Sequence, residues 1–155
     1  GVRGMTLDET GDDEVIGMIC IKDPEKETVM VVSEQGYGKR SEIEDYRITN
    51  RGGKGVKTLN ITEKTGNLVA IKSVTDENDL VIINKSGITL RMKVADVRIM
   101  GRATQGVRLI NLEKRNDEIA SVCKVLSETE SDSSNSENID SASEINEAEA
   151  SETTE

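Results

Sequence analysis

The sequence contains no histidine, no tryptophan and no phenylalanine, and only one proline and two cysteines among 155 residues. Without histidine the chain has no Ser-His-Asp triad, no histidine general base and no histidine metal ligand. The cysteines, Cys20 and Cys123, each lie in a short apolar run, so neither a disulfide framework nor a zinc cluster is available. These absences exclude many hydrolytic and metal-dependent enzymes and favour a reduced, cytoplasmic compartment.

Long apolar runs are also missing. No segment reaches the length needed to cross a bilayer, so we expect no membrane partner. The start at Gly1-Val2-Arg3-Gly4 has neither an initiator methionine nor a signal-peptide pattern. We therefore expect the chain to be part of a longer protein.

Basic residues are outnumbered overall, because the chain has 20 Lys and Arg and 30 Asp and Glu, which gives a net charge of −10. Residues 127–155 contain ten acidic residues and no basic one, so this tail carries the entire net charge and residues 1–126 sum to zero. Residues 36–108 hold 14 basic against 8 acidic residues. A Ser- and Glu-rich tail buries too little apolar area to offset chain entropy, which predicts disorder.

An internal repeat emerges when the body is aligned with itself at a spacing of 51 residues. Periods of this size are typical of supersecondary units such as propeller blades, which bury their apolar faces by stacking on neighbours. Gly1-Val2-Arg3 matches the end of a still earlier copy. The aligned pairs are Gly36 with Gly87, Arg40 with Arg91, Asp45-Tyr46-Arg47 with Asp96-Val97-Arg98, Arg51 with Arg102, and Gly55-Val56-Lys57 with Gly106-Val107-Arg108.

Each copy has the pattern of β-strands. Apolar and polar residues alternate strictly from Ile88 to Val94, after a short loop that ends in Gly87, which predicts a hairpin with the preceding apolar run. The sequence therefore predicts an all-β protein of four-stranded, propeller-like blades. The expected strands are 28–32, 37–43, 55–61 and 68–74 in the first copy, and 80–83, 88–94, 106–112 and 119–126 in the second.

A glycine-rich basic loop, Asn50-Arg51-Gly52-Gly53-Lys54-Gly55-Val56, separates strands of the first copy. Three glycines let the backbone turn tightly and expose N–H donors, while two cations supply positive charge at the same place. This chemistry suits phosphate. The loop lacks the Gly-Lys-Ser/Thr sequence of a nucleotide P-loop. Its counterpart, 101–107, keeps the arginine and the final glycine.

The sequence resembles the C-terminal domain family of bacterial DNA gyrase A. The resemblance is carried by Tyr37-Gly38-Lys39-Arg40, by the loops 51–56 and 101–107, and by the acidic tail. The resemblance covers residues 1–126 and implies a β-pinwheel, a disc of four-stranded blades that binds duplex DNA on a basic rim and bends it. The characteristic motif of the family, the gyrase-A box, reads Gln-Arg-Arg-Gly-Gly-Lys-Gly, where this chain has Thr49-Asn50 before Arg51. We interpret the loop as a blade loop that resembles this motif, and the sequence leaves open whether it is the gyrase-A box itself.

The resemblance implies that wrapped DNA is presented to a type II topoisomerase, which introduces negative supercoils. In that family the cleaving tyrosine lies in an N-terminal domain, and ATP and Mg²⁺ serve the holoenzyme, so we expect no catalytic residue, cofactor or metal in this segment. The expected partners are duplex DNA, the rest of the gyrase A polypeptide and the gyrase B polypeptide, in the cytoplasm with the nucleoid. The candidate DNA contacts are Arg51, Gly52, Gly53, Lys54, Gly55, Lys57, Lys39, Arg40, Arg91, Lys93, Arg102 and Arg108.

The predicted organisation is the end of a preceding blade at 1–17, a blade at 18–70, the last blade at 71–126 and the tail at 127–155. Ten carboxylates tethered beside a basic rim would compete with phosphate, so we hypothesise that the tail weakens wrapping. Only two tyrosines are present for base stacking, which favours duplex over single-stranded nucleic acid. Two alternatives remain, the corresponding C-terminal domain of topoisomerase IV and a propeller-like protein-interaction module.

Overall fold

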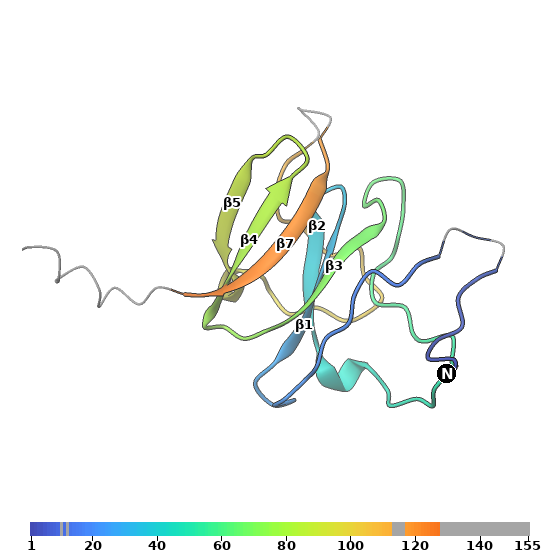
Figure 1. Ribbon diagram of the computed structural model, residues 1–155. Coiled ribbons are helices and arrows are strands. Elements are labelled where there is room, and N and C mark those ends of the chain that lie inside the picture. Colours follow the sequence, from blue (N-terminus) through green and yellow to red (C-terminus); the bar gives the residue numbers. More distant parts are fainter. Residues whose placement is uncertain (10, 12, 113–116, 128–155) are drawn as a thin grey trace, which may run out of the picture.

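Two antiparallel β-sheets make up the protein in the computed structural model, which describes residues 1–9, 11, 13–112 and 117–127 (Figure 1). The predicted all-β class is confirmed. Of the predicted acidic tail, only Ser127 lies within the described residues. In the described ranges, no helix has the length and apolar character of a membrane span.

The first sheet has the strand order β3-β1-β2-β6. Its strands are β1 (Thr28–Ser33), β2 (Tyr37–Glu42), β3 (Leu68–Val74) and β6 (Val107–Arg108). Strands β1 and β2 form a hairpin in which Thr28 lies opposite Glu42, and the connection ends at Gly36 with a φ of 82°. A left-handed φ of this size favours glycine, which explains the residue at the turn.

The second sheet has the order β5-β4-β7. Its strands are β4 (Asn78–Asn84), β5 (Thr89–Lys93) and β7 (Ile119–Leu126). The predicted alternation in β5 is confirmed, because Thr89, Arg91 and Lys93 are exposed while the two residues between them are half-buried.

The predicted repeat is also visible in the structure. Strands β1, β2 and β3 correspond to β4, β5 and β7 at the spacing of 51, and the short 3-10 helix η1 (Ile43–Asp45) falls on η2 (Val94–Asp96). The two sheets are therefore successive copies of one unit. The predicted blade boundary at residue 70 falls inside β3, and the division into blades stays a prediction.

Strand β6 joins the two copies, because it belongs to the second copy but pairs with β2 of the first, with Gly38 opposite Val107. The prediction of a strand at 55–61 is wrong, and the strand predicted at 106–112 is only Val107–Arg108. A segment of this kind pairs with the hairpin of the preceding copy, and within the described residues no hairpin precedes β1, so 55–61 has no partner strand. The segment at 107–108 has such a hairpin but pairs with β2 only at Tyr37 and Gly38, which limits the strand to two residues.

The main apolar core lies between the two sheets and includes Met30 and Val32 of β1 packed with Leu80 and Ile82 of β4. All four side chains are essentially inaccessible, and burying each contributes about 1.5–3 kcal/mol relative to leaving it exposed. A smaller cluster of Val29, Val31 and Leu59 covers the other face of the first sheet. Figure 1 shows the second sheet at the upper left, with β7 between β4 and the first sheet.

Candidate nucleic-acid interface

The Arg51 loop is fastened by its backbone to the segment that contains Arg3. The Gly52 N–H donates to the Gly4 carbonyl at 2.9 Å, and the Thr6 N–H and hydroxyl donate to the Gly53 and Gly52 carbonyls at 3.0 and 2.6 Å. Gly52 has a φ of 76°, which a side chain would strain. The loop is thereby held beside Arg3, and the side chain of Arg51 is exposed.

The Arg102 loop is fastened to the first copy mainly by the side chain of Arg102. Arg102 donates from Nε to the Asp45 carbonyl at 2.9 Å and from Nη1 to the Lys57 carbonyl at 2.8 Å. The Asn60 N–H donates to the Thr104 carbonyl at 2.9 Å. The Arg51 loop thus contacts residues that directly follow Gly1-Val2-Arg3, and the Arg102 loop contacts Lys57 and Asn60 at and after Gly55-Val56-Lys57, so the two loops occupy similar places one copy apart.

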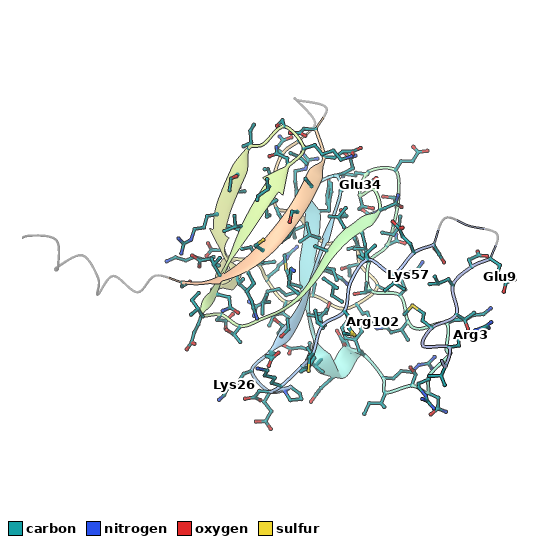
Figure 2. The ribbon with its side chains drawn as sticks, in the orientation of Figure 1. Arg3, Glu9, Lys26, Glu34, Lys57 and Arg102 are labelled. Carbon is teal, nitrogen blue, oxygen red and sulfur yellow. The ribbon has the colours of Figure 1, made fainter. Side chains whose placement is uncertain are left out.

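The labelled residues in Figure 2 follow this arrangement. Arg102, Lys57 and Arg3 succeed one another from the middle of the view to its right side, whereas Lys26 lies at the lower left. Within the described part of the chain, the side chains of Arg51, Lys54 and Lys57 form no ion pair, so their charge is not compensated by a carboxylate. Exposed, uncompensated cations on turns that also present backbone N–H groups can bind phosphate oxygens.

Lys39 lies inside the protein instead of on this surface. Its side chain is fully buried, and Nζ donates to the Gly101 carbonyl at 2.6 Å and to the Arg102 carbonyl. Burial lowers the pKa of Lys39, an effect that Asp45 opposes. Lys39 therefore stabilises the Arg102 loop of the candidate interface by hydrogen bonds to its backbone. A direct contact of Lys39 with DNA stays a prediction.

Arg40 is buried as well and connects the two sheets. Its Nε–H donates to Thr28 Oγ1 at 3.1 Å, and Nη1 donates to Asp76 Oδ1 at 2.7 Å and to the Val94 carbonyl at 3.1 Å. The Met100 N–H also donates to the Arg40 carbonyl at 2.8 Å. The neighbouring basic residues of β2 thus fix the position of the second copy against the first.

Two of the remaining predicted residues lie on the second sheet. Arg91 donates from Nε to Asp79 Oδ2 at 2.8 Å, and Lys93 is exposed at the end of β5. The Ser127 hydroxyl and, secondarily, Arg91 hold the pKa of Asp79 below its ordinary value. Both residues lie on β5, the edge strand of the second sheet, and on neither of the two basic loops.

Arg108 packs on Tyr37. Its guanidinium lies 5.5 Å from the ring centroid and donates from Nη2 to the Tyr37 hydroxyl at 2.9 Å. Lys64 lies 5.6 Å from the same centroid and was not among the residues predicted from the sequence. The internal repeat could have identified it, because Lys64 aligns with the basic residue Arg115 at the spacing of 51. Both contacts are cation–π interactions that fix a cation beside a buried ring.

The arrangement offers cations and backbone donors, which bind anions. In residues 1–9, 11, 13–112 and 117–127, no group of three or more acidic or cysteine side chains is placed to hold a metal ion. Cys20 and Cys123 are free thiols, in agreement with the predicted lack of a disulfide framework.

Two copies of one β-unit, a four-stranded and a three-stranded sheet joined by a strand of the second copy that pairs with the first, define a blade-repeat protein of the propeller class. The family model described as the DNA gyrase C-terminal domain, beta-propeller, matches residues 1–22, 27–75 and 78–123. The chain belongs to this family. The resemblance noted in the sequence is thereby confirmed.

Individual relatives agree with the family match. The chain is 46% identical over 137 residues to the gyrase A polypeptide of Staphylococcus aureus strain NCTC 8325 / PS 47, which covers 88% of this chain and 15% of the relative. It is 52% identical over 112 residues to that of strain MRSA252, covering 72% and 12%. The chain thus spans less than one sixth of the length of these relatives.

Two solved structures have a similar fold. The structure of the DNA gyrase A C-terminal domain superposes with a TM-score of 0.61 at 27% identity, covering 66% of this chain and 34% of the other. The C-terminal domain of DNA topoisomerase IV superposes with a TM-score of 0.73 at 21% identity, covering 81% and 38%. At that identity the second likeness is one of fold alone.

Proposed function

We propose that this chain binds duplex DNA along its two basic loops and bends it, as the wrapping module of a DNA gyrase that introduces negative supercoils. The observation that carries the proposal is the repeated docking of the loops. Hydrogen bonds to Gly4, Thr6 and Lys57 hold the Arg51 and Arg102 loops one copy apart, with Arg51 and Lys54 exposed. Cations repeated at a structural period match the repeated phosphates of a curved duplex.

Sequence-independent affinity for duplex DNA comes mainly from neutralising phosphates and releasing counterions. Base stacking on aromatic rings has little part here, because Tyr37 is buried under Arg108 and Lys64 and Tyr46 packs on the smaller apolar cluster. Binding by charge and shape is therefore the mode that these residues support.

The relatives named above are gyrase A polypeptides, and the chain spans 15% of the first of them. In the proposed assembly this segment supplies DNA binding only. Strand cleavage, ATP binding and Mg²⁺ belong to the rest of the gyrase A polypeptide and to the gyrase B polypeptide, in the cytoplasm. A piece of DNA wrapped beside the cleavage site gives strand passage its direction.

The test of binding is the salt dependence of affinity for a duplex of random sequence. Replacing Arg51 and Lys54 together by Ala removes two exposed cations, and each lost phosphate contact lowers the slope of log K against log salt by about 0.9. Lys26→Ala is the matched control, because Lys26 is exposed, pairs with Asp23 at 3.5 Å and lies away from the loops (Figure 2). Equal slopes for the double variant and the control would refute the proposed interface and favour a protein-interaction module.

Wrapping needs a separate readout. Ligating nicked circular DNA in the presence of the protein traps any writhe as a change in linking number. We expect a change with the unaltered chain and a smaller change with the Arg51→Ala, Lys54→Ala variant at matched occupancy. Tight binding with no change in linking number would restrict the function to binding without bending.

A further inference from the structure

Arg102 of the second copy holds together the two ends of the segment that contains the Arg51 loop. Its Nε–H donates to the Asp45 carbonyl at 2.9 Å, and Nη1 donates to the Lys57 carbonyl at 2.8 Å. Asp45 precedes the loop in the chain and Lys57 follows it. One guanidinium thus closes the base of residues 45–57. In Figure 2, Arg102 lies between the short helix η1 and Lys57.

A second contact closes the same base from within the first copy. The hydroxyls of Tyr46 and Thr58, which are the next residues after Asp45 and Lys57, form a hydrogen bond. Tyr46 also packs on the smaller apolar cluster, which fixes its ring. The base is therefore closed once by the first copy itself and once by Arg102. Only the contact with Arg102 couples the two basic loops to each other.

The Arg102 loop is in turn fixed by β2 of the first copy. Lys39 donates from Nζ to the carbonyls of Gly101 and Arg102, and the Ser41 hydroxyl donates to the Met100 carbonyl at 2.9 Å. Burial above all, and the nearby charge of Arg102 in addition, lower the pKa of Lys39. Two cations can lie this close together because each donates to two carbonyl oxygens.

The shape of the guanidinium suits this role. Its N–H groups point in fixed directions in one plane, so one side chain can bind two carbonyls that belong to separate segments. A lysine ammonium is a compact charge without this fixed pair of directions. Two of the three guanidinium nitrogens of Arg102 donate to protein carbonyls, and its side chain is half-buried. Arg102 is therefore placed to support the Arg51 loop.

We infer that Arg102 is a positioning residue that holds the Arg51 loop where Arg51 and Lys54 bind DNA, and that it does not bind phosphate itself. The sequence predicted a direct contact for this residue, as for Arg51. The inference rests on the proposed function for its effect on DNA, whereas the holding of the loop can be measured without DNA. It also links the copies, because a shift of the second copy moves the group that closes the loop of the first.

The first test measures the position of the loop in the absence of DNA. Spin labels are attached at Asn50→Cys and Ala103→Cys, which are exposed positions beside the two arginines. The native thiols are exposed and are removed by Cys20→Ser and Cys123→Ser. The distribution of distances between the labels then reports how firmly one basic loop is held against the other.

Arg102→Lys is the decisive substitution, because it keeps the charge and removes the planar set of donors. The distribution of label distances should broaden with Arg102→Lys and also with Arg102→Met. Arg98→Lys is the matched control, since Arg98 is an exposed arginine of the same copy, and it should leave the distribution unchanged. An unchanged distribution with both Arg102 variants would overturn the inference, even if their stability falls.

The second test asks whether Arg102 acts through the Arg51 loop when duplex DNA is bound. Arg102→Lys should lower the affinity for a duplex of random sequence, because the charge is kept but the loop is released. Added to the Arg51→Ala, Lys54→Ala variant, the same substitution should cause little further loss, since the effects of coupled residues do not add.

A direct phosphate contact would give the opposite results. Arg102→Lys would keep the affinity, Arg102→Met would reduce the salt slope by about 0.9, and this loss would add to that of the Arg51→Ala, Lys54→Ala variant. Any of these results would overturn the inference.

The two tests also separate failure of the inference from failure of the proposed function. If the unaltered chain has no salt-dependent affinity for duplex DNA, the proposed function is refuted, and the label distances still decide whether Arg102 holds the loop. A broadened distribution combined with unchanged DNA affinity would mean that the position of the loop does not matter for binding, and would overturn the positioning role.

Discussion

Replacing Arg40 by methionine separates a structural role for this residue from a role in DNA binding. Arg40 and Arg91 are counterparts in the repeat, yet Arg40 is 3% exposed and Arg91 lies on the surface. Methionine preserves most of the aliphatic volume and removes the guanidinium. Arg91→Met is the matched control at the same place in the second copy.

The expected loss of stability follows from the partners that Arg40 leaves behind. Thr28 Oγ1 still donates to the Val74 carbonyl at 3.3 Å, and the Val94 carbonyl still accepts from the Val97 N–H at 2.9 Å. Each loses one bond in a buried setting, which costs about 1 kcal/mol apiece. Asp76 is 74% exposed and is rehydrated, so its ion pair contributes less than about 1 kcal/mol. The free energy of unfolding should fall by about 2–3 kcal/mol.

For Arg91→Met a fall of about 1 kcal/mol or less is expected, because Arg91 is 41% exposed and Asp79 also accepts from the Ser127 hydroxyl. Urea unfolding followed by far-ultraviolet circular dichroism measures both variants, since the chain lacks tryptophan. The midpoint should move with little change in the m value. Under native conditions the salt slope of DNA binding should be unchanged for Arg40→Met. A stability loss no larger than that of Arg91→Met, or a reduced salt slope, would refute the assignment of Arg40 as a clamp between copies.

Three further outcomes test other parts of the structure. Gly106→Ala should destabilise the fold by more than about 2 kcal/mol, because a positive φ is combined with a Cβ 2.6 Å from the Gly38 oxygen. Gly55→Ala should cost only the backbone strain of about 1 kcal/mol, because its Cβ would meet nothing within 4 Å. Equal effects in thermal unfolding of dilute protein would contradict this geometry. The Ser86 hydroxyl, more than any other group, holds the pKa of Asp117 below its ordinary value, so the folded state binds fewer protons than the unfolded state. The resulting stability is present above about pH 4 and is lost as the pH falls. In urea titrations, Asp117→Asn should therefore reduce the fall in the free energy of unfolding at acid pH. Removing residues 128–155, which keeps the Ser127 N–H donated to the Glu77 carbonyl, should raise DNA affinity at low salt, and equal affinities would rule out competition by the tail.

Much of the candidate interface could be predicted from local pattern. The Arg51 and Arg102 loops were found because glycines and cations recur at a fixed spacing, and the structure places the two loops in matching positions. The same reasoning assigned Lys39 and Arg40 to the surface set, because Tyr37–Glu42, unlike the strand after Gly87, has no alternation of apolar and polar residues from which burial can be predicted. Burial of Lys39 depends on the carbonyls of Gly101 and Arg102, more than sixty residues away.

The sequence by itself determined the class of fold, the two copies and their hairpins, because alternation and glycine turns act over a few residues and are written twice in the chain. Only the tertiary structure decided which copy completes which sheet. Val107 forms a strand and Val56 does not, although both follow a glycine with nearly the same φ, because only Val107 has a β2 edge beside it. Strand identity at these positions is a property of the neighbour that supplies the hydrogen bonds, and a residue pattern does not encode whether that neighbour is present.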